Sequence, residues 1–278
     1  MKTMKYAMCN ELYEAWSFER VCDFLSESGY AGVEIAPFTF ATDTPSNVRT
    51  ITDERRKRLR QVAEKAGVQI IGLHWLLAKT EGFHLTSPDL GIRKQTADYL
   101  TALIHLCDDF GGTQLVLGSP KQRNLLPGVT HKQAADYACD VLGQLVPLLE
   151  KTSIVLSLEP LTSAETDFIN TAAEAVALIK RIDAPQQIAL HLDCKAMTAE
   201  TESIPNLIRK HKNEMVSFHA NDPNLQGPGF GKLDFVPIMA ALHEIDFNGW
   251  VSVEVFDYSP GPERLTLESI DYLKRCAP

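Results

Sequence analysis

Three carboxylates and one imidazole stand at the ends of four successive apolar runs in the second half of the chain. These residues are Glu159, Asp193, His219 and Glu254, and each closes a short run rich in Val, Ile and Leu. Carboxylates held close together repel each other, and a divalent cation bound by their oxygens and one histidine nitrogen removes that repulsion. The pattern therefore predicts a metal site whose ligands are these four side chains.

The donor types narrow the choice of ion. Oxygen donors with one nitrogen and no cysteine favour Mn²⁺, Mg²⁺ or Co²⁺ over a structural zinc. We expect one divalent ion, with Mn²⁺ the first choice and Mg²⁺, Co²⁺ or Zn²⁺ as alternatives. Each acid taken alone could instead be a strand-end residue in a salt bridge or a helix cap. Four metal-competent side chains at consecutive strand ends favour the metal site over that interpretation.

Short apolar runs alternate with longer amphipathic segments along the whole chain, which predicts strands followed by helices. A helix-capping box formed by Thr171 and Glu174 supports one of the helix starts. The expected strands cover residues 5–9, 32–36, 68–75, 113–118, 154–159, 187–193, 215–220 and 250–256. The expected helices cover residues 18–28, 53–66, 94–110, 131–151, 172–182, 205–212, 235–245 and 263–274.

Eight strand and helix units without a linker or a shift in composition predict an α/β fold, a single (β/α)8 TIM barrel that spans residues 1–278 as one domain. A dinucleotide-binding fold would need glycines after the first strand, and residues 10–13 contain none. In a barrel the reactive groups come from the carboxyl ends of the strands. The four predicted metal ligands should therefore meet at one mouth of the barrel.

Composition excludes several classes of partner. The formal net charge is -9 and no basic run compensates it, so nucleic acid is not an expected partner. The longest apolar stretch is too short to span a bilayer, so no membrane helix is expected. The six cysteines are scattered and form no CxxC pair, which predicts reduced thiols in a cytoplasmic protein.

The strand order and the Glu, Asp, His, Glu series at strands five to eight resemble the xylose-isomerase-like TIM barrels. Within them the chain resembles the sugar (phosphate) isomerase/epimerase group, which includes the ketose 3-epimerases. The resemblance implies that Glu159, Asp193, His219 and Glu254 bind the metal and that Glu159 and Glu254 also act as acid and base. It implies that Glu165 helps to hold the reacting end of a small carbohydrate substrate. A homodimer or homotetramer is the expected assembly.

Two positions depart from the ketose epimerases. Those enzymes have a histidine three residues after the metal aspartate and an arginine six residues after the metal histidine, where this chain has Ala196 and Leu225. Both family residues contact the hydroxymethyl ketone end of the sugar, so a simple free ketose is a poor match. We expect Lys195 to contact the substrate in their place, with Asn221, Asp222 or Asn224 in the loop after the seventh strand as alternatives.

Two polar residues in the first half of the chain also end predicted strands. Glu34 closes the second strand and His74 lies at the end of the third. Polar groups at a barrel mouth need partners, so we expect both to hydrogen-bond sugar hydroxyls.

Together these features predict a metal-dependent isomerase or epimerase that acts on a keto sugar or related polyol through an enediolate. The same metal site would also suit an inosose-type dehydratase or a keto-sugar lyase. A nuclease similar to the family-2 apurinic endonucleases is a weaker alternative, because the chain is acidic and its first half is poor in histidine. A non-catalytic sugar-binding barrel is the last alternative.

Overall fold

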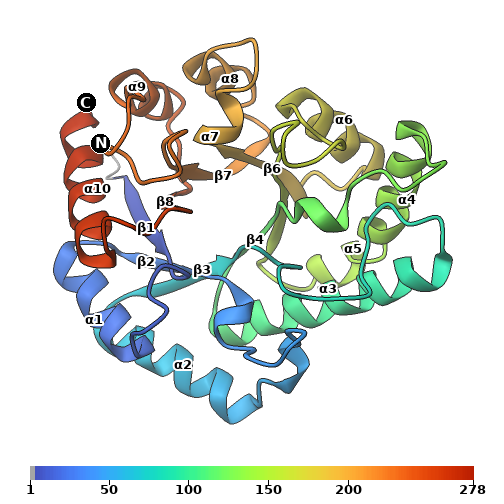
Figure 1. Cartoon of the computed structure of the whole chain (residues 1–278), viewed down its shortest axis with the longest axis horizontal. Helices are drawn as coiled ribbons and strands as arrows, with labels where there is room; N and C mark the ends of the chain where they lie inside the picture. The colour runs from blue at the N-terminus through green and yellow to red at the C-terminus, as the bar shows by residue number, and fades with distance from the viewer. Residues whose placement is uncertain (1–3) are drawn as a thin grey trace.

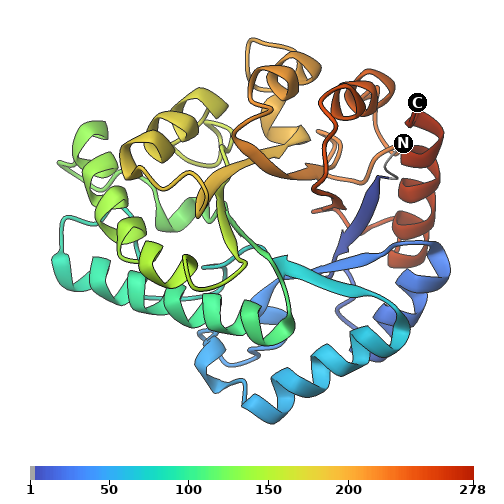
Figure 2. The same ribbon diagram turned by 180° about the vertical axis from the view of Figure 1, so that it is seen from behind.

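A computed structural model describes residues 4–278 of the chain. Eight parallel strands pair in sequence order, and β1 pairs with β8 to close a barrel. Figure 1 shows the strands in the middle of the molecule and the helices around them, and Figure 2 shows the same ring from behind. The prediction of a (β/α)8 barrel is confirmed. The strands are β1 (Lys5–Cys9), β2 (Gly32–Ile35), β3 (Gln69–Leu73), β4 (Gln114–Leu117), β5 (Val155–Leu158), β6 (Ile188–Asp193), β7 (Met215–Ala220) and β8 (Trp250–Val253).

Most helices begin at a side-chain cap. Ser17, Thr52 and Thr171 each accept a hydrogen bond from a backbone N–H of the first turn that follows. The helices on the outside of the barrel are α1 (Phe18–Ser28), α2 (Asp53–Ala66), α3 (Leu90–Phe110), α4 (His131–Gly143), α5 (Val146–Leu149), α6 (Ala172–Ile182), α7 (Cys194–Met197), α8 (Ile204–Lys210), α9 (Val236–Glu244) and α10 (Pro262–Cys276). Short 3₁₀ turns cover Pro37–Thr39, Val48–Thr50 and Pro120–Gln122.

Two of the expected helices differ from the sequence-based expectation by more than two residues at an end. The helix expected over residues 131–151 is two helices, because Pro147 has no N–H and its ring clashes with the carbonyl one turn earlier. Helix α3 begins four residues before the expected start. There the carboxylate of Asp89 accepts hydrogen bonds from the N–H groups of Gly91 and Ile92, at 2.7 and 3.2 Å.

Side chains fill the barrel interior in layers of different polarity. Ala7, Ile71 and Trp250 form a small apolar cluster separate from the main core. In another part of the interior, the hydroxyls of Ser157 and Ser217 lie 3.1 Å apart and link β5 to β7. The large apolar core lies between the strands and the helices, so the barrel does not depend on the polar interior for most of its burial.

None of the helices in the described part of the chain combines the length and the apolar character that crossing a bilayer requires. All six cysteines are free thiols, and five of them are buried.

Candidate active site

The four predicted metal ligands meet at the carboxyl ends of their strands. Glu159 follows the last residue of β5, Asp193 ends β6, His219 lies near the end of β7 and Glu254 follows β8. One ligand atom from each of the four lies within 4.8 Å of the others, and all four side chains are buried. Three carboxylate oxygens and one imidazole nitrogen at this spacing form a donor set that suits a divalent cation.

The electrostatics of the acids fit a cation as well. Burial, together with the charges of Glu254 and Asp193, raises the pKa of Glu159 to about 8. Burial and the charge of Glu254 raise the pKa of Asp193 to about 6. Buried carboxylates that repel each other hold protons that a bound cation would displace. The residues present therefore fit the divalent ion predicted from the sequence.

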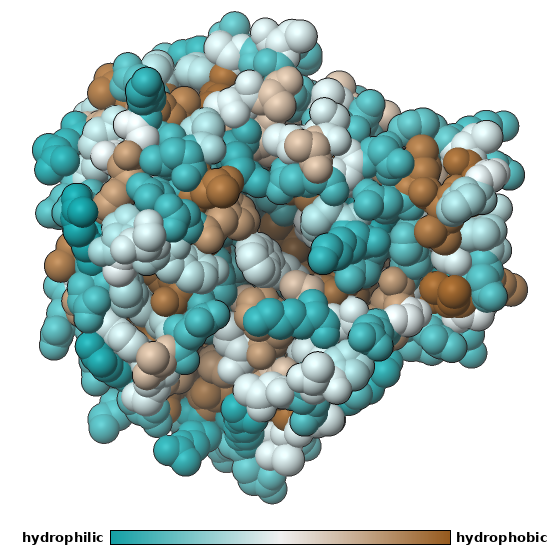
Figure 3. Space-filling model, viewed as in Figure 1, coloured by the Kyte–Doolittle hydropathy of each residue, from teal (hydrophilic) through white to brown (hydrophobic). Residues whose placement is uncertain are grey.

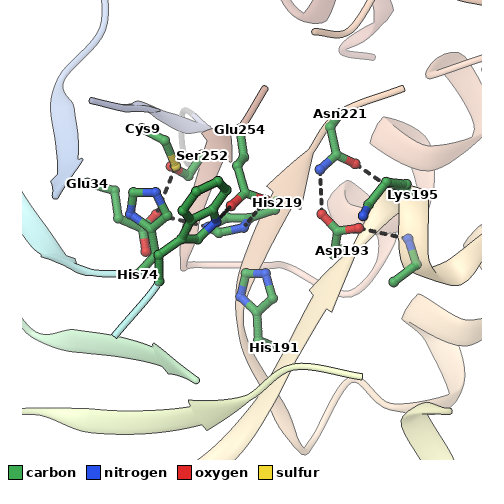
Figure 4. Close-up of polar contacts among 12 residues, drawn as sticks. Cys9, Glu34, His74, His191, Asp193, Lys195, His219, Asn221, Ser252 and Glu254 are labelled. Carbon is green, nitrogen blue, oxygen red and sulfur yellow. Dashed lines mark hydrogen bonds and ion pairs between the residues drawn. The ribbon is translucent and has the colours of Figure 1, made fainter. Parts of the chain in front are cut away.

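His219 is fixed by a carboxylate on each side of its ring. Its Nδ1 lies 3.1 Å from Oε2 of Glu254, and its Nε2 lies 3.1 Å from Oε2 of Glu34. The other oxygen of Glu34 accepts a hydrogen bond from Nε2 of Gln114 at 3.0 Å. Figure 4 shows Glu34 and Glu254 on either side of His219. Glu34 is outside the four-residue cluster, so its contact with Nε2 can orient the ring, while Nδ1 faces Glu254 of the cluster and is the nitrogen placed to ligate.

Burial alone would raise the pKa of Glu34, but the charge and hydrogen bond of His219 lower it well below the usual glutamate range. Glu34 is completely buried and does not line the cavity described below. The prediction that Glu34 binds sugar hydroxyls is not supported by this placement. Both of its carboxylate oxygens are already engaged, and its contact is with a predicted metal ligand.

Asp193 is held by its own helix and by the neighbouring strand. Its Oδ1 accepts a hydrogen bond from the N–H of Ala196 at 2.7 Å, so the carboxylate also caps the short helix α7. Its Oδ2 accepts a hydrogen bond from Nδ2 of Asn221, and the amide oxygen of Asn221 accepts the N–H of Lys195 at 2.8 Å. Figure 4 shows Asn221 joined by hydrogen bonds to both Asp193 and Lys195. Asn221 thus locks the end of β6 and the start of α7 to β7.

Glu254 has a second fixed contact. Nε1 of Trp75 donates to Oε1 of Glu254 at 2.7 Å, and the indole stacks on Phe256 with ring centroids 5.9 Å apart. Burial alone would raise the pKa of Glu254, but His219 and the Trp75 hydrogen bond lower it. Trp75 is therefore a wall of the site as well as a donor to one of the predicted catalytic acids.

A cavity of about 390 Å³ opens next to the cluster. Two of the four predicted ligands, Glu159 and Glu254, reach its wall. Figure 3 shows a hollow near the middle of the face seen in Figure 1. The remaining lining residues are Trp75, Ala78, Lys79, Gly118, Ser119, Pro120, Lys121, Gln122, Leu161, Glu165 and Phe256.

Glu165 and Lys195 form an ion pair beside this cavity. Nζ of Lys195 lies 2.6 Å from Oε1 of Glu165 and 4.5 Å from the ring centroid of Phe256. The Lys195 side chain is 13% exposed and that of Glu165 is 28% exposed, so both remain within reach of a molecule in the cavity. The structure thus brings these two predicted substrate-binding residues together.

His74 is not brought to the cavity. Its side chain is completely buried, and Nε2 lies 2.9 Å from Oε2 of Glu11. Nδ1 of His74 and the other oxygen of Glu11 have no partner among the described residues. The expected contact of His74 with sugar hydroxyls is not supported by this placement. The neighbouring residue, Trp75, is the one that faces the cavity.

A buried arginine supports the loop after β5, and sequence reasoning missed it. Nη1 and Nη2 of Arg123 donate to the backbone oxygens of Glu159 and Ile169 at 2.7 and 3.1 Å. Burial lowers the pKa of the guanidinium to about 10. Gln114, the donor to Glu34, was missed too. Neither residue ends a strand, so the rule that found the ligands could not find them.

A family model, several curated proteins and several solved structures match this chain. A family model described as "Xylose isomerase-like TIM barrel" matches residues 22–276. The probable ketose 3-epimerase of Synechocystis sp. is 26% identical over 231 residues, which cover 83% of this chain and 75% of the relative. The D-psicose 3-epimerase of Ruminiclostridium cellulolyticum is 26% identical over 261 residues, which cover 90% and 82%.

A solved structure of D-psicose 3-epimerase with D-tagatose, from Clostridium cellulolyticum H10, has a similar fold. It superimposes with a TM-score of 0.84 at 21% identity and covers 98% of this chain and 99% of its own. This likeness confirms the barrel and the order of its elements.

Proposed function

This chain belongs to the xylose isomerase-like TIM barrel family, and on that premise we propose that it is a divalent-metal-dependent epimerase or isomerase of a keto sugar. One observation carries the proposal. Glu159 and Glu254 belong both to the four-residue cluster and to the wall of the cavity. Two carboxylates that reach both places can act on a substrate held beside the metal site. The names of the sugar epimerases to which this chain is similar support the same reaction class.

Glu159, Asp193, His219 and Glu254 would hold the metal. A divalent cation at this site would supply positive charge for the oxygen that becomes negative when the carbon next to a carbonyl loses its proton. Glu34, Asn221 and Trp75 keep the ligand side chains oriented, as their hydrogen bonds indicate.

The two glutamates would move the proton. One takes it from the carbon and the other returns a proton to the opposite face, which inverts that carbon. Trp75 and His219 each hold one oxygen of Glu254. Glu159 lies against Gly118, where an added Cβ would come within 2.2 Å of the carboxylate, so only glycine leaves room for the acid. Glu254 is therefore held in place before a substrate enters, and Gly118 leaves the space that the Glu159 carboxylate occupies.

The substrate should differ from a simple free ketose. Ala196 offers no side-chain polar atom and Leu225 is an exposed apolar residue, so neither can replace the histidine and arginine of the ketose epimerases. A hydroxymethyl ketone would leave polar atoms poorly paired, at a cost of about 1–3 kcal/mol per buried group. We expect Lys195 and Glu165 to bind the reacting end instead. Free fructose or tagatose should be poor substrates.

Proton exchange with solvent tests the proposed reaction. Keto sugars are incubated with metal-loaded protein in D₂O, and deuterium in the recovered sugar is measured by NMR. We expect exchange and a new epimer. Glu159→Gln and Glu254→Gln should each lower turnover by about 10²–10⁴, because each amide keeps a ligand oxygen and loses the proton acceptor. Glu54→Gln, at an exposed position on α2, is the matched control. Normal turnover by both active-site variants would contradict the proposal.

The same experiment separates the alternatives. Loss of water from the sugar, seen as a mass lower by one water, would assign a dehydratase on the same site. Ligand binding without any exchange would assign a sugar-binding barrel. Assembly as a homodimer or homotetramer and a cytoplasmic location stay predictions, and size-exclusion chromatography with light scattering tests the first.

A further inference from the structure

Two lysines line the cavity on the loops after β3 and β4. Lys79 follows β3, and Lys121 lies in the 3₁₀ turn after β4. Both side chains are exposed, and they share this cavity with the acids Glu159 and Glu254. The cavity therefore carries cationic groups as well as the acids of the metal cluster.

Neither of these lysines is neutralised by a neighbouring acid. Among residues 4–278, no carboxylate oxygen lies within 4.0 Å of the ammonium of Lys79 or Lys121, whereas Lys195 pairs with Glu165. The ammonium of Lys79 lies 4.0 Å from the ring centroid of Phe38. This cation–π contact stabilises the ammonium but does not neutralise its charge. Among the lysines of residues 4–278, only Lys195 and Lys210 pair with an acid, so it is the shared cavity, and not the lack of a partner, that sets Lys79 and Lys121 apart.

The backbone of the same two loops is shaped unusually. Trp75, Lys79 and Ser119 have φ values of 50°, 58° and 44°, in the left-handed region that non-glycine residues rarely adopt. All three line the cavity. Hydrogen bonds hold this shape: the oxygen of Lys79 accepts the N–H of Ser46 at 2.9 Å, and Oγ of Ser119 accepts the N–H of Leu77 at 3.2 Å. Strain of this kind persists where the surrounding structure enforces it, which is typical of ligand sites.

We infer that the substrate carries an anionic group, a phosphate ester or a carboxylate, which Lys79 and Lys121 bind while its keto end faces Glu159 and Glu254. This inference rests on the proposed function for the identity of the keto end. It also explains how binding is maintained without the contacts that Ala196 and Leu225 cannot make, because an ammonium bonded to an anion forms a strong, charge-assisted hydrogen bond.

Kinetics with matched substrates test the inference. A neutral ketohexose, its 6-phosphate and the corresponding keto-sugar carboxylate are compared on the metal-loaded wild-type protein, on Lys79→Ala, on Lys121→Ala and on the double variant. We expect the double variant to raise KM for the preferred anionic substrate at least tenfold and to change KM for the neutral sugar less than twofold. Lys132→Ala, on the exposed face of α4, is the matched control. The anionic substrate whose KM rises in the lysine variants shows whether the bound group is a phosphate or a carboxylate.

A binding measurement keeps this inference separate from the proposed reaction. Calorimetry with Glu159→Gln, whose turnover should be lower by about 10²–10⁴, compares the neutral sugar with each anionic form, and repeats the comparison at higher salt. Tenfold tighter binding of an anionic form, lost in the triple variant that also carries Lys79→Ala and Lys121→Ala, supports the inference even if no sugar is epimerised. Equal affinity for neutral and anionic forms, or affinity unchanged by the lysine substitutions, overturns it even if epimerase activity is found.

Discussion

Two buried side chains, those of Glu34 and Asn221, hydrogen-bond to predicted metal ligands and do not line the cavity. Glu34 bonds to His219, and Asn221 bonds to Asp193. Each contact uses a side chain from a different strand, so the ligands are oriented by the barrel as a whole. Partners of this kind typically change metal affinity when they are replaced.

Glu34→Gln should weaken metal binding by about 10–100-fold, because the amide can still bond to His219 but no longer brings a negative charge to the ring. Isothermal titration with Mn²⁺ measures the affinity. Glu54→Gln is the control, since its side chain is exposed on α2 and remote from the cluster. Unchanged affinity in Glu34→Gln would show that His219 needs no help from this carboxylate.

Metal affinity should rise with pH between about 6 and 8. Without metal, Glu159 and Asp193 hold protons up to pKa values of about 8 and 6 in the folded protein, because burial and mutual repulsion raise both. Binding a cation must release these protons, so lower pH opposes binding. Titrations at pH 7 in buffers of different ionisation enthalpy should detect proton release. Glu159→Gln in the same buffers should release fewer protons, because a carboxyl with a pKa of about 8 is mostly protonated at pH 7. An affinity independent of pH would contradict the expectation.

The ligands could be predicted from the sequence because each stands at the end of an apolar run. The role of Glu34 could not. Glu34 points into the barrel, as alternation along β2 predicts, but its partners His219 and Gln114 come from β7 and β4. Nothing in the residue types around Glu34 signals these partners. The role of a strand-end residue therefore depends on strands that are distant in sequence.

Elements with strong local signals were predicted most closely. Helices α1, α2 and α6 match their expected bounds, since Ser17, Thr52 and Thr171 cap their first turns. Gly29 and Gly67 end the first two in the left-handed conformation that glycine adopts freely. Helix α7 was not expected, because its four residues are too few to show a helical period.

The loop after β5 should lose stability when Arg123 is replaced by lysine. One ammonium cannot reach both the Glu159 and the Ile169 oxygens as the guanidinium fork does, so a buried carbonyl loses its partner. We expect a loss of about 1–3 kcal/mol in the free energy of unfolding, measured in urea. Arg55→Lys on α2 is the control, because that residue is exposed and its side chain makes no hydrogen bond to residues 4–278. Equal stability of the two variants would show that the fork is dispensable.

In the molecule as a whole, the fold depends on apolar side chains, whereas the site consists of polar side chains at the mouth of the barrel. The main apolar core lies between the strands and the helices, and a separate apolar cluster of Ala7, Ile71 and Trp250 lies inside the barrel. The acids of the site contribute charge that burial disfavours, as the raised pKa of Glu159 indicates. The barrel should therefore fold without its metal and gain stability when the metal binds.

Asp193→Asn separates these two contributions. Asparagine is as good a helix cap as aspartate, so the hydrogen bond from Ala196 that begins α7 should survive, while one charged ligand is lost. The circular dichroism spectrum of the metal-free variant should match that of the wild type. At Mn²⁺ concentrations of about 100 times Kd, the free energy of unfolding of the wild-type protein should rise by about 2.7 kcal/mol. For a domain of this size, that corresponds to a rise in Tm of roughly 5 °C or more. The variant should show little of this shift at the same concentration. A full shift in Asp193→Asn would place the metal elsewhere, and a variant that fails to fold would show that the carboxylate is part of the structural core.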